Sequence, residues 1–227
     1  MVDLVRLGSR HDGGYFLPKS YKKIRRAICA GIGNNYEFES DLAKTMDIIY
    51  LIDGSISAPT NLTKNMMFLQ QNLGIESSQA LVTLGELIEK AKVPNSLEQE
   101  KYLLKMDIEG AEWEILEKTD GNVLEKCKIM VLELHDLRNM IENHSERTIA
   151  MFNRLLETHR VAWSGVNNYA HFYFVGGKRF PNVIELLMLS NDHEADKSGN
   201  FGGVYSQNDE KRKSFRMPFS TVQSTIP

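Results

Sequence analysis

The stretch KYLLKMDIEGAEWEIL, residues 101–116, decides the fold, because a short apolar run passes there directly into a helical pattern. Lys105 and Asp107 alternate along the expected strand, so both side chains face the same side of it. A central strand covered by helices on both faces is normally apolar, and unpaired charges there are costly. We therefore predict a functional site at this strand-to-helix junction. The alternative is a buried Lys–Asp pair that only supports the fold.

Apolar runs and helical patterns alternate along the rest of the chain. Strands are predicted at residues 26–31, 47–53, 79–83, 102–107 and 128–134, and helices at 36–45, 58–73, 84–91, 110–118 and 147–158. This alternation is typical of βαβ units and predicts a parallel sheet with right-handed connections. Later apolar runs at 160–163, 171–175 and 183–189 could complete the sheet. Because no helix separates the last two, we expect an antiparallel strand near one edge.

Composition indicates an ordinary globular protein and argues against a nucleic-acid-binding or a membrane-spanning protein. The chain has 227 residues, a net charge of −3 and scattered basic residues, so no nucleic-acid footprint is present. No apolar run approaches the length of a membrane span. We expect one domain at residues 1–189, whose first 25 residues cover the cofactor side, and a polar loop or tail at 190–227. The pattern makes no prediction of oligomeric state.

Two cysteines, Cys29 and Cys127, lie in apolar segments, which favours free thiols over a disulfide. With no visible signal peptide, free thiols favour a cytoplasmic location.

The first predicted strand runs into AGIGNNYEFE, residues 30–39. Gly31 and Gly33 would let the backbone approach a ligand at the positive N-terminus of the next helix. The dinucleotide fingerprint requires a third glycine where this chain has Tyr36, which argues against a pyrophosphate in the turn. Asp53 ends the second strand, where it could bind ribose hydroxyls. The alternative is two turn glycines and a capping aspartate.

Five segments carry a family resemblance: GIGNNYEFE (31–39), IIYLIDGS (48–55), TLGEL (83–87), KMDIEGAEWEIL (105–116) and MVLELH (130–135). Together they resemble the FkbM-type class I S-adenosylmethionine-dependent methyltransferases. The segments RLGSRHDGGYFLP, VNNY and FPNVIELLML extend the similarity to about residues 6–189. The Asp-x-Glu-Gly-Ala-Glu run is the most specific element of this similarity. Gly85 departs from the family pattern, in which an aspartate commonly follows Thr-Leu.

The resemblance implies an α/β, Rossmann-like class I methyltransferase fold, with a mostly parallel seven-stranded sheet and helices on both faces. It implies S-adenosylmethionine as cofactor, and O-methylation of a hydroxyl on a sugar, glycan or related small molecule. Two alternatives stay open, a non-catalytic S-adenosylmethionine- or nucleotide-binding module and an NAD-dependent Rossmann oxidoreductase.

Ligands of open α/β sheets bind beyond the carboxyl ends of the strands. A methyl donor would lie over residues 31–34 with its ribose at Asp53, and its sulfonium would face Asp107 and Glu109. The candidate cofactor-binding residues are Gly31, Gly33, Asn34, Asp53, Gly54, Thr83 and Asp107. The candidate catalytic residues are Lys105, Asp107, Glu109 and His135.

Glu133 and His135 alternate on the fifth strand, which should lie beside the fourth. We predict that Glu133 pairs with Lys105 and that His135 is a candidate base, with a structural histidine as the alternative. Asp107 with Glu133, His135 or Asp136 could hold a divalent cation. No tight ligand motif supports a metal, so metal-independent chemistry is favoured.

Two smaller motifs leave their roles open. The run Asp12-Gly13-Gly14-Tyr15 could fold over the cofactor or form a tight turn, and Asn167-Asn168-Tyr169 could bind substrate or cap a loop.

Overall fold

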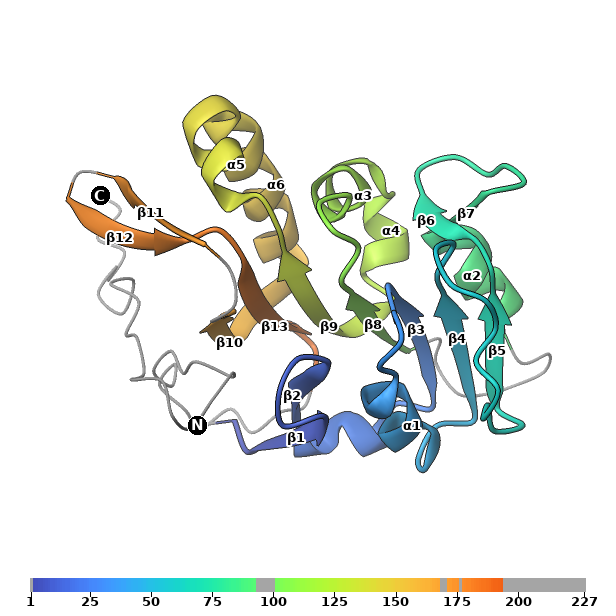
Figure 1. Cartoon of the computed structure of the whole chain (residues 1–227). Helices are drawn as coiled ribbons and strands as arrows, with labels where there is room; N and C mark the ends of the chain where they lie inside the picture. The colour runs from blue at the N-terminus through green and yellow to red at the C-terminus, as the bar shows by residue number, and fades with distance from the viewer. Residues whose placement is uncertain (1, 93–100, 168–170, 176, 194–227) are drawn as a thin grey trace.

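The computed structural model describes residues 2–92, 101–167, 171–175 and 177–193, and its centre is one seven-stranded sheet (Figure 1). The strand order is β10-β13-β9-β8-β3-β4-β5. Strands β9, β8, β3, β4 and β5 are parallel, whereas β13 runs antiparallel to both β9 and β10. The bounds are β3 Arg26–Ala30, β4 Ile48–Ile52, β5 Met66–Leu69, β8 Tyr102–Met106, β9 Cys127–Leu134, β10 His159–Val166 and β13 Ile184–Ser190.

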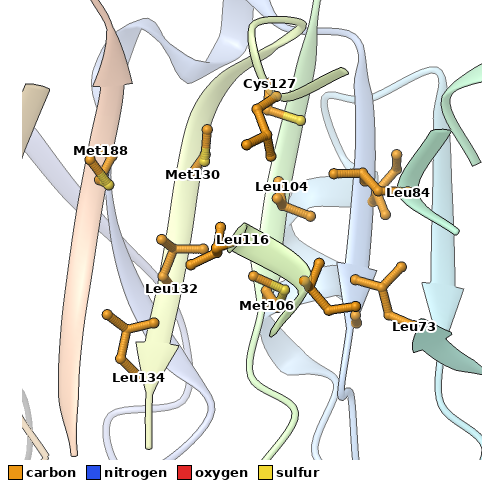
Figure 2. Close-up of a cluster of buried hydrophobic side chains, with 14 of the residues drawn as sticks. Leu73, Leu84, Leu104, Met106, Leu116, Cys127, Met130, Leu132, Leu134 and Met188 are labelled. Atoms are coloured by element: carbon orange, nitrogen blue, oxygen red, sulfur yellow. The ribbon is translucent and has the colours of Figure 1, made fainter. Parts of the chain in front are cut away.

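Helices cover both faces of this sheet, because alternate strand residues belong to two different hydrophobic clusters. Leu104 and Met106 of β8 pack with Leu116 of α3 on one face, as Figure 2 shows, whereas Leu103 belongs to the cluster on the other face. The first face carries α2 Leu84–Lys90, α3 Glu112–Lys118, α4 Gly121–Leu124, α5 Leu137–Asn143 and α6 Ser145–Thr158. The second carries α1 Glu37–Ala43, the short 3₁₀ helix η1 Lys19–Lys23 and the hairpin of β1 Leu4–Gly8 with β2 Gly14–Pro18.

The predicted fold class is confirmed, and so is the antiparallel strand near one edge, which is β13. Both cysteines are free and buried. Among the described residues, no helix has the length and apolarity needed to cross a bilayer. Residues 194–227, most of the expected polar tail, lie outside the described residues.

The predicted helix at 58–73 is wrong, because this segment holds β5 and the short strand β6 Asn72–Gly74. Its apolar residues fit the spacing of a helix and of a strand, and short runs of this kind cannot be separated by periodicity. Pairing with β4 decides the outcome, since Met66 lies beside Ile49 and Leu69 beside Ile52.

Two predicted strands form but do not join the central sheet. The run at 79–83 is β7 Leu81–Thr83, which pairs with β6. The run at 171–175 is β11 Phe172–Val175, which forms a hairpin with β12 Lys178–Pro181. Strand propensity is present in both runs, but their neighbours are set by long-range packing.

Candidate functional site

A cavity of about 420 Å³ lies at the carboxyl ends of β3, β4 and β8. Its volume falls within the roughly 300–1,000 Å³ of small-molecule sites. The predicted residues among its lining are Gly31, Gly33, Asn34, Asp53, Lys105, Asp107 and Glu109. The sheet therefore brings most of the candidate set to one place.

Gly31 is required by a close backbone crossing at the floor of this cavity. Its φ is +73°, and a Cβ there would lie 1.5 Å from the carbonyl oxygen of Asp107. Gly33 also has a positive φ, +54°, but a Cβ on it would meet no atom within 4 Å. The two glycines thus serve different purposes: Gly31 lets β3 and β8 approach each other, and Gly33 leaves open space.

We predict that Gly31→Ala destabilises the fold by roughly 2–3 kcal/mol, because the clash forces a backbone shift in addition to strain at positive φ. Gly33→Ala is the matched control and should cost only about 1–2 kcal/mol, the left-handed conformational penalty. Urea unfolding of both variants tests the difference. Equal losses would show that the crossing tolerates a side chain.

Asp53 holds the glycine turn against the end of β4. Its Oδ2 accepts a hydrogen bond from Gly33 N at 2.9 Å, and its Oδ1 accepts from Ser55 N at 2.8 Å and Ser55 Oγ at 2.6 Å. Burial acts to raise the pKa of Asp53, but the hydrogen bonds from Ser55 and Gly33 outweigh it and lower that pKa. A ribose hydroxyl that binds Asp53 would share this carboxylate with the backbone of Gly33.

Two predicted cofactor residues do not belong to the lining of this cavity. The Thr83 side chain caps α2, accepting from Glu86 N at 3.2 Å in a reciprocal capping box. Gly54 lies against Asn72, to whose Oδ1 its N donates at 3.0 Å. Asn72 and Leu73 line the cavity instead, and the erroneous helix at 58–73 concealed them.

Lys105 is buried between acidic side chains, with only 3% of its surface exposed. Its Nζ donates to Gly31 O and lies 3.4 Å from Asp107 Oδ2 and 4.0 Å from Glu39 Oε1. Burial acts to lower the pKa of Lys105, but Asp107 and Glu39 raise it overall.

The predicted pairing of Lys105 with Glu133 is wrong. In the β8–β9 register Lys105 lies beside Val131, which places Glu133 two residues further along, level with Asp107. Glu133 Oε1 instead accepts from Asn167 Nδ2 at 2.7 Å. Asn168 and Tyr169, named with Asn167 in the sequence motif, lie outside the described residues.

The segment before the first central strand folds over the cavity, so that Asp12, Gly13 and Tyr15 line it. Tyr15 OH donates to Asp107 Oδ2 at 2.7 Å, and the Lys105 ammonium lies 5.4 Å from the centre of the Tyr15 ring. Burial and the neighbouring Asp107 raise the pKa of Tyr15 well above its usual value. Tyr15 therefore fixes one oxygen of Asp107 and leaves Oδ1 for other contacts.

His135 is oriented by the fully buried carboxylate of Glu112, a residue of the predicted junction to which the sequence assigned no role. Glu112 accepts from Ile108 N at 2.7 Å and Gly110 N at 2.9 Å, and its Oε1 lies 3.1 Å from His135 Nδ1. A carboxylate that accepts these bonds leaves Nδ1 as the donor. Burial acts to lower the pKa of His135, but Glu112 and the acids around it raise it to about 9.

The other ring nitrogen, His135 Nε2, faces three carboxylates. It lies 3.8 Å from Asp107 Oδ1, 3.8 Å from Glu133 Oε1 and 3.6 Å from Glu109 Oε2. Burial and Asp107 raise the pKa of Glu133 to about 7. Glu109 has a positive φ of +57°, an uncommon conformation that presents its exposed carboxylate at this point. Acid–base groups from β9 and from the turn after β8 thus converge beside the cavity.

Comparison with known proteins identifies a family. The model of the FkbM methyltransferase domain matches residues 13–159, which include every lining residue of the cavity except Asp12, and the group around His135. No curated protein gives a significant match.

Several solved structures resemble the chain at low identity. Precorrin 8W decarboxylase from Methanobacterium thermoautotrophicum is 14% identical, with a TM-score of 0.34, over 73% of this chain and 81% of that one. The tRNA (m1A58) methyltransferase TrmI from Aquifex aeolicus is 11% identical, with a TM-score of 0.37, over 76% and 64%. A putative methyltransferase from Streptococcus mutans, solved with SAH, is 12% identical, with a TM-score of 0.32, over 73% and 86%.

Proposed function

The chain belongs to the FkbM methyltransferase family and is S-adenosylmethionine-dependent, and from this premise we propose that it methylates a hydroxyl oxygen of a sugar, glycan or related small molecule. Membership of a methyltransferase family argues against the two earlier alternatives, a non-catalytic binding module and an NAD-dependent oxidoreductase. The observation that carries the proposal is the convergence of Asp107, Glu133 and His135 beside the cavity. The carboxylates of Asp107 and Glu133 can accept a hydrogen bond from a hydroxyl and assist removal of its proton.

The cavity suits the methyl donor. Open space at Gly33 admits a ligand close to the backbone, and the Asp53 carboxylate lies next to it at the end of β4, where it can accept from a ribose hydroxyl. Further along the cavity, the carboxylates of Asp107 and Glu109 would balance the positive charge of a sulfonium. When bound, S-adenosylmethionine supplies an electrophilic methyl group.

The residues of this chain have two tasks in such a reaction. They must hold the acceptor oxygen in line with the methyl group, which supplies much of the rate. They must also remove the proton of a poorly acidic hydroxyl. Tyr15 and Glu112 assist both tasks, because they fix the orientations of Asp107 and His135.

Incubation with labelled donor and a panel of acceptors tests the proposal. We expect label to enter acceptors that carry free hydroxyls, and not the same compounds with those hydroxyls blocked. Transfer only to amine, carbon or thiol acceptors would contradict O-methylation while leaving the enzyme class intact.

The donor end of the cavity gives a separate prediction. Asp53→Ala should weaken binding of S-adenosylmethionine by roughly 1–3 kcal/mol, the scale of lost hydrogen bonds to a charged acceptor. Asp47→Asn, an exposed acid just before the same strand β4, is the control and should leave affinity unchanged. Calorimetry measures the affinity of both variants for S-adenosylmethionine, under conditions in which each variant is fully folded. Unchanged affinity in Asp53→Ala would remove this residue from the donor site.

A further inference from the structure

The atoms around His135 Nε2 are close to one another but are not hydrogen bonded. Its distances to Asp107 Oδ1, Glu133 Oε1 and Glu109 Oε2 are 3.8, 3.8 and 3.6 Å. A direct N–H···O hydrogen bond spans roughly 2.7–3.2 Å, so this nitrogen and these oxygens lie about half an ångström too far apart for direct pairing but share a small space. Atoms that ligate one ion keep this kind of separation.

The spacing is compatible with one bridging ion. Ligand atoms of Asp107, Glu133 and His135 all lie within 4.8 Å of one another. Two ligands on a common ion can be separated by at most twice a bond of roughly 2.1 Å. Both 3.8 Å separations from Nε2 already satisfy this limit, and small side-chain rotations bring the two carboxylates within it.

Each of the three side chains is also held by an outer partner. Glu112 bonds His135 Nδ1, Tyr15 OH bonds Asp107 Oδ2, and Asn167 Nδ2 bonds Glu133 Oε1. Metal-binding histidines usually donate their second nitrogen to a carboxylate, and metal-binding carboxylates are themselves hydrogen bonded. This arrangement holds Nε2 and Oδ1 toward the shared space.

Several acidic side chains adjoin this group, and Lys105, 3.4 Å from Asp107 Oδ2, is a cation already next to them. Asp107 follows β8 level with Glu133 of β9, and Glu133 lies directly beside Glu185 of β13, so three carboxylates form a row across neighbouring strands. Glu185 is 3% exposed, and its Oε2 has no hydrogen-bond partner among the described residues. Like charges placed side by side are unfavourable, and a cation here would offset that repulsion.

We propose that Asp107, Glu133 and His135 bind a divalent cation of the Mn²⁺ type. Two carboxylates balance its charge and are ligands that suit Mn²⁺, whereas the imidazole nitrogen is unfavourable for Ca²⁺ and Mg²⁺, which take oxygen ligands. Three protein ligands leave coordination positions open for an acceptor. As a binding site the proposal stands on geometry, and its catalytic role rests on the proposed function.

In that role the cation replaces a protein base in activating the hydroxyl. Contact with the acceptor oxygen lowers the pKa of the hydroxyl, so its proton leaves to solvent through the exposed side near Glu109. The oxygen then forms a bond to the methyl carbon while the carbon–sulfur bond breaks, and the bonding electrons stay on sulfur. Charge balances, because the sulfonium becomes a neutral thioether and one proton is released.

Mn²⁺ alone is the probe for this site. We expect electron paramagnetic resonance titration of the whole chain to show one saturable Mn²⁺ per chain, without donor or acceptor present. Pulsed measurements should detect a coupled nitrogen from the imidazole, and His135→Gln should abolish that coupling. A lack of saturable binding at millimolar Mn²⁺, both with and without S-adenosylhomocysteine, would overturn the proposal.

Variants at the carboxylates locate the site. Glu133→Gln removes a ligand charge and should weaken Mn²⁺ binding by more than the roughly 10–100-fold typical for losing an outer partner. Glu89→Gln, an exposed acid paired with Lys92, is the control and should bind as the wild type does. Circular dichroism confirms that each variant is folded. Wild-type Mn²⁺ affinity in folded Glu133→Gln would place the ion elsewhere and contradict this assignment.

Activity measurements separate this inference from the proposed function. Full O-methylation by enzyme treated with chelator would reject the catalytic role of the cation and leave the function standing. Saturable Mn²⁺ binding with its nitrogen coupling, but no methylation of any hydroxyl, would reject the function and leave the cation site standing.

Discussion

Asp107→Asn should lower the rate of methyl transfer by about 10²–10⁴-fold, the largest effect on activity that we expect from a single substitution. Asp107 lies between the two halves of the site: its Oδ2 accepts from Tyr15, and its Oδ1 faces His135. Asparagine keeps the shape and can still accept from Tyr15, but it removes the charge that opposes a sulfonium and assists proton release. Single-turnover kinetics with saturating donor measures the loss.

Tyr15→Phe is the control for this result. It keeps the aromatic ring beside Lys105 and removes only the hydrogen bond to Asp107. The expected loss is about tenfold, which corresponds to one charge-assisted hydrogen bond of roughly 1.5 kcal/mol. If Asp107→Asn retained the wild-type rate, neither charge balance nor proton removal could be assigned to this residue, and Glu109 would be the next candidate.

Lys105→Met should give the largest loss of stability, about 3–5 kcal/mol in the free energy of unfolding. The ammonium is the cation next to two acidic side chains, Asp107 at 3.4 Å and Glu39 at 4.0 Å. Neither oxygen of the buried Glu39 side chain has a hydrogen-bond partner among the described residues. Methionine fills a similar volume, so the loss reports the uncompensated charge more than the packing. Urea denaturation of the purified variant measures it.

The double variant Lys105→Met with Glu39→Gln tests the cause. If charge imbalance is responsible, removing the Glu39 carboxylate should restore part of the stability lost in the single variant. Additive losses in the two single variants would instead assign the effect to packing around β8.

Local pattern predicted the central strands well, because β3, β8 and β9 are buried, bounded by turns and separated by helices. It also placed Asp53 and Asp107 correctly at strand ends beside one cavity. It failed at residues 58–73, where the spacing of the apolar residues fits both a helix and a strand. The cavity residues Asn72 and Leu73 were missed because they fall within that wrongly predicted helix.

Other parts of the site could not be predicted from local pattern at all. The bond from Tyr15 to Asp107 joins residues 92 positions apart, and no spacing rule encodes it. The partner of Lys105 depended on the register between β8 and β9, which places Val131 and not Glu133 beside it. Glu112 lies within the helix predicted at 110–118 and had no predicted role, although its carboxylate accepts from the preceding turn and orients His135.

Some residues that line the cavity lie outside the central sheet, and these tolerate substitution better than those on its strands. Asp12 lies in the turn between β1 and β2, and Asn72 lies on a short strand outside the seven-stranded sheet. Substitutions there reshape the entrance without disturbing the packed strands that carry Lys105 and Glu133. Descendants of this protein can therefore change the molecules they accept through these residues while the reacting groups stay in place, which is the route by which one scaffold acquires many substrates.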